Sequence, residues 1–156
     1  DIDADWTKKN GERHFGYKDH VKCDADSKLI TNYSVTSASV HDSQRCLVFI
    51  GQEDEVLYAD SAYSGKPIAL ALPENCKNQI CEKGYRNSPL TSEQKMNNRR
   101  KSRIRCRIEQ IFGFMTGAMH GITIRSIGIT RAWMNIGITN LVYNFCRYSY
   151  LKRASA

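Results

Sequence analysis

The segment from residue 13 to residue 23 alternates apolar and polar side chains, and this period of two constrains the fold more than any other feature of the sequence. Apolar positions such as Phe15, Tyr17 and Val21 fall on one face of an extended chain, and charged positions fall on the other. A half-buried β-strand is therefore predicted over residues 13–23. The polar run DADSK predicts a hairpin turn, and residues 29–38 return as a second strand. Residues 1–12 are polar, with a turn expected at Asn10-Gly11 and no strand.

The middle of the chain predicts short helices and strands in alternation. Asp42 is suited to cap a short helix over residues 44–50, and Pro67 lies near the start of another that ends before Pro73. Residues 55–59, EVLYA, are almost wholly apolar, which is typical of a central strand covered on both faces. Residues 78–83 predict one more short strand.

Two longer helices are predicted after residue 91. The first runs from about Ser92 to Phe114, because its apolar positions recur at steps of four, three and four. Those positions are Ile104, Ile108, Ile111 and Met115. The second helix is expected to begin at Thr130 as its N-cap. Its expected buried face consists of Trp133, Met134, Ile138, Leu141, Val142 and Phe145. This order of elements predicts a single α/β domain over residues 1–156.

Charge is distributed unevenly along the chain. Residues 1–75 carry eight Lys or Arg against thirteen Asp or Glu, whereas residues 76–156 carry fifteen against three. A strongly basic half on a folded domain favours a polyanionic partner, with nucleic acid the first candidate. No apolar run approaches membrane-spanning length, so no membrane partner is expected. The six cysteines lack the spacing of a zinc site and indicate free thiols in a reducing cytoplasm.

Asp60 is the first candidate functional residue. It directly follows the predicted buried strand, and open α/β sheets place ligand-binding groups at the carboxyl ends of their strands. A metal-binding carboxylate is one interpretation. The alternative is structural, because Asp also caps turns and the first turns of helices.

Glu109 is the second candidate, and it lies at the end of a basic run. Seven Lys or Arg and no acid occur between residues 95 and 107, a pattern suited to neutralising phosphates along a nucleic-acid backbone. The expected DNA-binding residues in this run are Arg99, Arg100, Lys101, Arg103 and Arg107. A carboxylate at the end of such a ridge is well placed to hold a divalent cation at a phosphate. The structural alternative is an ion pair with Arg105 one helical turn earlier.

Phosphodiester chemistry explains why two acids on different elements could act together, as ligands of the same metal ions. Two Mg²⁺ ions roughly 4 Å apart activate the attacking oxygen and stabilise the leaving one in many nucleases and polymerases. Mg²⁺ prefers oxygen ligands and retains several waters, so a few carboxylates suffice. Asp60 and Glu109 are therefore predicted to bind Mg²⁺ or Mn²⁺, and a shared ion cluster usually requires a third carboxylate.

Several segments, in order, resemble successive blocks of a bacterial insertion-sequence transposase of the DDE type. They are DADWTKKNGERHFGYKDHVKCD, VTSASVHDS, EVLYADSAYSG, RIRCRIEQIFG and RSIGITRAWMNIGITNLVYNFCR. The resemblance is to insertion-sequence family five, which is related to family four, and it covers nearly the whole chain. It implies a ribonuclease-H-like mixed sheet with flanking helices, and Mg²⁺-dependent strand cleavage and strand transfer at transposon ends. It also implies double-stranded DNA as partner, and a homodimer is a further partner to consider.

The same resemblance assigns roles to individual residues. It identifies Asp60 in YADSAY as the second acid of the triad, and Arg105 and Glu109 as the Arg-x-x-x-Glu pair that supplies the third. The Tyr and Lys that flank this pair in the family are not at their usual offsets, where Ser102 and Met115 or Thr116 stand. The first acid and its core strand are expected upstream of residue 1, which would leave this chain catalytically incomplete.

Two other interpretations remain open from the sequence. The chain could be a non-catalytic DNA-binding remnant of a transposase, in which only the basic surface is functional. It could instead be a free-standing nuclease that takes its third carboxylate from Asp24 or Asp3. Neither Asp lies where a strand end would hold it, since Asp24 is expected in the hairpin turn.

Overall fold

The computed structural model describes residues 1–9, 11–121 and 123–155. They divide into two compact units, one of Asp1–Asp42 with Gln110–Ala156 and the other of Ser43–Glu109. Each unit has its own sheet and its own helices, so the mixed α/β class is confirmed. The turn expected at Asn10-Gly11 includes residue 10 and so lies outside the described residues. In the described part of the chain, no helix combines the length and the apolar character needed to cross a membrane.

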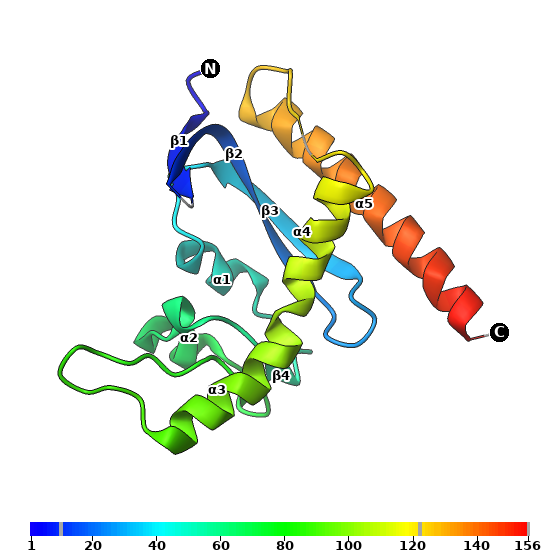
Figure 1. The fold of residues 1–156 in the computed structure, drawn as a ribbon. Helices are drawn as coiled ribbons and strands as arrows, with labels where there is room; N and C mark the ends of the chain where they lie inside the picture. Colours follow the sequence, from blue (N-terminus) through cyan, green and yellow to red (C-terminus); the bar gives the residue numbers. More distant parts are fainter. Residues whose placement is uncertain (10, 122, 156) are drawn as a thin grey trace. The chain divides into compact units, whose positions relative to one another are not determined.

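The first unit contains an antiparallel sheet of three strands, β1 (Asp5–Lys9), β2 (Glu12–Cys23) and β3 (Ile30–Ser37), in that order (Figure 1). The β2–β3 hairpin is confirmed. Strand β1 corrects the expectation that residues 1–12 hold no strand. Its sequence is polar, but it pairs with the start of β2, and the rings of Trp6 and Phe15 lie 5.2 Å apart across that pair. Such cross-strand contacts stabilise a strand whose own composition does not predict it.

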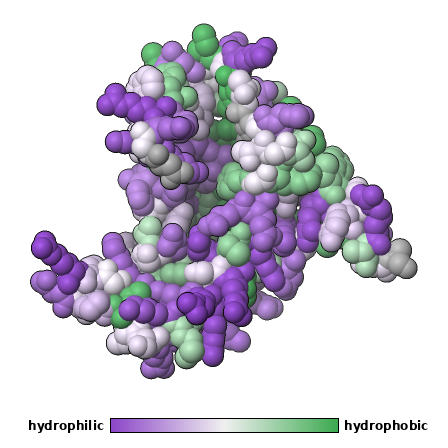
Figure 2. Space-filling view, in the orientation of Figure 1, coloured by the Kyte–Doolittle hydropathy of each residue, from purple (hydrophilic) through white to green (hydrophobic). Residues whose placement is uncertain are grey.

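Helix α5 (Ile129–Ala154) packs on β3 through a face different from the expected one. Its buried residues are Ala132, Ile136, Asn140 and Tyr143, and the first two pack against Val35 of β3. The six residues expected to be buried have exposed fractions from 40% to 63%. They are Trp133, Met134, Ile138, Leu141, Val142 and Phe145. Hydrophobic residues are accordingly visible along α5 in Figure 2.

Long-range contacts explain this choice of face. Gly137 leaves room for the ring of Tyr33, which a Cβ at that position would strike. The Asn144 side chain holds both backbone groups of Ile30, accepting from its N–H and donating to its carbonyl oxygen, each at 2.8 Å. These contacts orient α5 toward the β2–β3 hairpin, and residue hydrophobicity along the helix does not reveal them.

The start of α5 also differs from the expectation, because the helix begins at Ile129 and Thr130 lies inside it. The first N–H groups find acceptors at the other end of the chain. Asp1 Oδ2 accepts from the N–H of Gly128 at 3.1 Å, and Asp3 Oδ2 accepts from that of Ile129 at 3.0 Å. Carboxylates at a helix N-terminus satisfy these donors and oppose the positive end of the helix dipole.

The long helix expected over residues 92–114 forms as two helices, α3 (Ser92–Arg105) and α4 (Arg107–Gly117). The break is at Cys106, whose ψ of −7° departs from the value of about −42° in a regular α-helix. The predicted start is confirmed, with Thr91 and Gln94 forming a reciprocal capping box. Of the predicted apolar positions, Ile111 and Met115 are fully buried, whereas Ile104 and Ile108 are half-buried.

The second unit contains two parallel strands, β4 (Val56–Leu57) and β5 (Lys77–Asn78), with α1 (Ser43–Phe49) and α2 (Lys66–Ala71). Its core consists of Cys46, Ile68 and Ile80. The hydrogen-bond ladder is longer than the strands themselves, since it runs from the carbonyl of residue 55 to that of residue 59. This range matches the strand predicted over 55–59, and the partner segment, residues 77–81, begins one residue earlier than expected.

Candidate active site

Asp60 lies where the β4 ladder ends, one residue after the last carbonyl that bonds to the partner strand. It is exposed, and its Oδ1 accepts from the N–H of Ser61 at 2.6 Å, which makes it the N-cap of a short 3₁₀-helix, Ser61–Tyr63. The structural role that the sequence left open is therefore present. Oδ2 of Asp60 makes no hydrogen bond with the described residues, so one carboxylate oxygen is available to a ligand.

Glu109 lies in the first turn of α4, where the helix dipole favours a negative charge. Its Oε1 is 2.9 Å from Nη2 of Arg105, and its side chain is 61% exposed. The predicted i,i+4 ion pair is thus present as well. At this exposure the pair contributes about 0.3–0.5 kcal/mol at most. Its main effect is to hold one oxygen of Glu109 while the other has no partner in the described chain.

Both candidate acids belong to the second unit. The donor set suits a hard divalent cation, since carboxylate oxygens are the ligands that Mg²⁺ prefers. Within residues 1–9, 11–121 and 123–155, however, no group of three or more His, Cys, Asp or Glu could hold a metal ion. Asp60 and Glu109 are thus two carboxylates of the same unit whose oxygens have the chemistry that Mg²⁺ prefers, and in the described residues they belong to no larger group of metal ligands.

The predicted DNA-binding residues differ in how freely they can reach a phosphate. Arg99, Arg100 and Arg103 of α3 are exposed. Lys101 is half-buried, donates to the carbonyl oxygen of Ile80 at 2.9 Å and lies 3.9 Å from Glu82. Lys101 therefore fastens α3 to the strand segment that follows β5. Figure 2 shows mainly hydrophilic residues over α3.

Arg105 and Arg107 are half-buried beside Glu109. Arg105 makes the ion pair described above, so its charge is already partly balanced. Exposed and paired cations therefore alternate along this run, because Lys101 and Arg105 each lie beside a carboxylate whereas Arg99, Arg100 and Arg103 are exposed.

The acids considered as third ligands in the nuclease interpretation are engaged elsewhere. Asp24 accepts from the hydroxyl of Ser27 at 2.5 Å and from its N–H at 2.6 Å. These hydrogen bonds, the hydroxyl first, hold the pKa of Asp24 below its usual value. Asp3 accepts from the first N–H of α5. Both carboxylates have structural roles in the first unit, and the sequence anticipated only the turn at Asp24.

Sequence reasoning missed a hollow in the second unit that is lined by Tyr58, Gln79 and Asn97 among others. A signal for one of them was available. Tyr58 precedes Asp60 by two residues in an extended segment, and residues two apart in a strand share a face. The two amides could not be found in this way, because they come from other elements.

Comparison with known proteins identifies the family of this chain. The family model described as the transposase DDE domain matches residues 2–145, so the chain belongs to this family of insertion-sequence transposases. One relative is the transposase for insertion sequence element IS1106 of Neisseria meningitidis serogroup B, 34% identical over 116 residues. That match covers 72% of this chain and 40% of the relative, so the chain spans well under half of the relative's length. No solved structure matches the chain.

Proposed function

We propose that this chain forms part of the catalytic domain of a transposase that cuts and joins DNA strands at the ends of an insertion sequence. The proposal includes a ribonuclease-H-like core and membership of insertion-sequence family five. The observation that carries it is the pair of acids, Asp60 at the end of a strand ladder and Glu109 beyond a basic helix, inside a segment that matches the transposase DDE family.

The residues of the chain have distinct tasks in this mechanism. Asp60 Oδ2 and the unpaired oxygen of Glu109 are the groups that would hold Mg²⁺ or Mn²⁺. When bound, such ions supply Lewis-acid activation of the attacking oxygen and charge stabilisation of the leaving one. Arg105 orients Glu109 through the 2.9 Å contact and lowers the local negative charge. Arg99, Arg100 and Arg103 bind successive backbone phosphates and position the strand.

A third carboxylate is expected from a segment outside residues 1–156. Two findings support this. The described residues contain no group of three metal-binding side chains, and the relative is much longer than this chain. We therefore expect the isolated chain to bind DNA without cutting it, and a longer version that includes the segment upstream of residue 1 to cut.

The experiment compares these two versions on supercoiled plasmid carrying the ends of the element, with Mg²⁺ present. The longer version should nick the DNA, and Asp60→Asn or Glu109→Gln should abolish nicking. Glu93→Gln is the matched control, because Glu93 is an exposed acid in the first turn of α3 and should not affect cleavage. Nicking that survives both active-site substitutions would refute the assignment.

The second candidate function is a non-catalytic DNA-binding module. It is favoured by the structural contacts that Asp60 and Glu109 already make, to Ser61 and Arg105. This candidate predicts salt-sensitive DNA binding in both versions and cleavage in neither. The longer version with Mg²⁺ therefore separates the two functions directly.

A further inference from the structure

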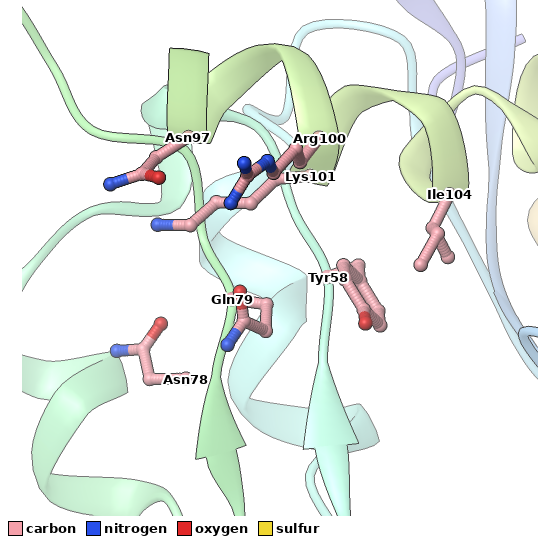
Figure 3. A pocket seen from close by; sticks show the side chains of 7 residues that line it. All are labelled: Tyr58, Asn78, Gln79, Asn97, Arg100, Lys101 and Ile104. Carbon is pink, nitrogen blue, oxygen red and sulfur yellow. The ribbon is translucent and has the colours of Figure 1, made fainter. Parts of the chain in front are cut away.

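The second unit contains a cavity of about 420 Å³ between the β4–β5 segment and α3. Figure 3 shows Asn97, Arg100 and Lys101 reaching from α3 toward Gln79, with the ring of Tyr58 beside them. This volume is within the range of small-molecule sites, about 300–1,000 Å³. It is not used by the pair of acids described above.

Strand geometry explains why Tyr58 faces this cavity. Its neighbours Leu57 and Ala59 pack against the core of the unit, so Tyr58 points to the opposite side of the ladder. Helix α3 covers that side, and the Asn98 side chain of α3 is hydrogen-bonded there to the backbone of Glu82. Asn98 both accepts from the N–H of Glu82 at 2.8 Å and donates to its carbonyl oxygen at 2.9 Å. These two hydrogen bonds fix the position of α3, which forms one wall of the cavity.

The lining combines three kinds of group. Tyr58 and Ile104, both half-buried, provide an aromatic ring and an aliphatic wall. Gln79 and Asn97 provide side-chain amides that make no hydrogen bond with the described residues, and each amide both donates and accepts. The amide of Asn78 is different, because its oxygen already accepts from the N–H of Ile80 at 3.0 Å.

Charge in the cavity matches one phosphate. Lys101 is engaged by the carbonyl of Ile80, whereas Arg100 is exposed and has no ion pair or hydrogen bond to the described residues. A single free guanidinium fits a monoester or diester phosphate and is too little for a triphosphate. These groups match the parts of a nucleotide. The aromatic ring can stack on a base, the two amides can hydrogen-bond to the edge of the base, and the cation can bind the phosphate.

We propose that this cavity binds one unpaired nucleotide of DNA, with its base against Tyr58, its edge on Gln79 and Asn97, and its phosphate on Arg100. A base must leave the duplex to present both its face and its edge in this way. Tyr58 and Asp60 are two residues apart in the same extended segment and share one side of it. The bound nucleotide therefore lies on the same side as the DNA strand that Asp60 would hold. The inference rests on the proposed function, because it takes the DNA substrate from there.

The test measures binding of the 156-residue chain, without metal, to a short single-stranded oligonucleotide and to a matched duplex by fluorescence anisotropy. Tyr58→Leu should weaken single-strand binding about 5- to 150-fold, the range for loss of one stacked base. Duplex binding should be unchanged. Tyr58→Phe is the control, since it retains the ring and should remain within about threefold of the parent. Unchanged single-strand binding in Tyr58→Leu, or an equal loss in Tyr58→Phe, would overturn the proposal.

A double variant keeps the test decisive if Tyr58→Leu does not fold. Gln79→Ala with Asn97→Ala removes the two free amides without altering a buried apolar side chain, and should weaken single-strand binding alone. No change in that variant would also reject the site. Failure of DNA cutting by the longer chain, with these binding differences intact, would refute the catalytic function and leave the nucleotide site standing.

Discussion

Asp19 of β2 is a carboxylate buried against Asn140 of α5. Asn140 Nδ2 donates to Asp19 Oδ1 at 3.3 Å, while Asp19 Oδ2 and Asn140 Oδ1 are buried without a hydrogen-bond partner among the described residues. Burial raises the pKa of Asp19 to about 6, and the hydrogen bond from Asn140 opposes this only in part. We predict that Asp19→Asn stabilises the first unit at neutral pH. The substitution removes the buried charge and replaces the unpartnered oxygen Oδ2 by an amide nitrogen that can donate a hydrogen bond.

The magnitude follows from the two pKa values. The folded value of about 6 exceeds the ordinary value of 3.8, and one pKa unit corresponds to about 1.4 kcal/mol, so the charged form costs about 2–3 kcal/mol. Because the folded pKa is the higher one, the stability from this carboxyl is fully present below pH 3.8 and is lost as the pH rises through 6. The gain from Asp19→Asn should therefore be about 2–3 kcal/mol at pH 7.5 and close to zero near pH 4.

The assay is urea unfolding followed by tryptophan fluorescence. Trp6 and Trp133 are the two tryptophans of the chain, and both belong to the unit that contains Asp19. Glu12→Gln makes the same charge change at an exposed position of the same unit and should alter the free energy of unfolding by less than about 0.5 kcal/mol, because its ion pair with His14 is an exposed 3.9 Å contact. A destabilised Asp19→Asn variant, or a gain that does not change with pH, would refute the reasoning.

Two further predictions concern α3. Thr91→Ala removes one half of the capping box and should lower the stability of the second unit by about 1 kcal/mol, measured as a lower thermal midpoint in circular dichroism, with no loss contradicting the cap. Replacing exposed Arg99 and Arg103 by Gln should reduce the slope of log affinity for DNA against log salt by about 1 per lost phosphate contact, whereas Lys8→Gln on β1 should not change it.

The elements that the sequence predicts well are those whose pattern is local. Alternation predicts the strand β2, although the structure buries His20 on its polar face and leaves Phe15 52% exposed. The polar run DADSK predicts the turn that follows, where Asp24 accepts from the N–H of Ser27. Strand β1 is different. Its polar residues are held by pairing with β2, and no local pattern shows that pairing.

The residues of the candidate site likewise fall into those that a local pattern predicts and those that only tertiary packing brings together. Asp60 and Glu109 can be predicted because each follows a local signal, the end of an apolar strand and the end of a basic run. The fit of Gln79 and Asn97 around Tyr58 depends on how α3 lies across the β4–β5 ladder, which is a tertiary property. The hydrogen bond that holds Lys101 to Ile80 is likewise invisible in a count of basic residues.

Ile136 and Ile138 of α5 provide a direct test of tertiary choice over local pattern. The sequence predicts Ile138 in the core. In the structure Ile138 is 58% exposed, whereas Ile136 is only 2% exposed. Ile136→Ala should lower the free energy of unfolding by about 2–5 kcal/mol, since it leaves a cavity against Val35. Ile138→Ala should change it by less than about 0.5 kcal/mol, because an exposed helical site gains from the propensity of Ala. Tryptophan fluorescence during urea unfolding measures both, and a larger loss in Ile138→Ala would show that α5 packs through its apolar stripe after all.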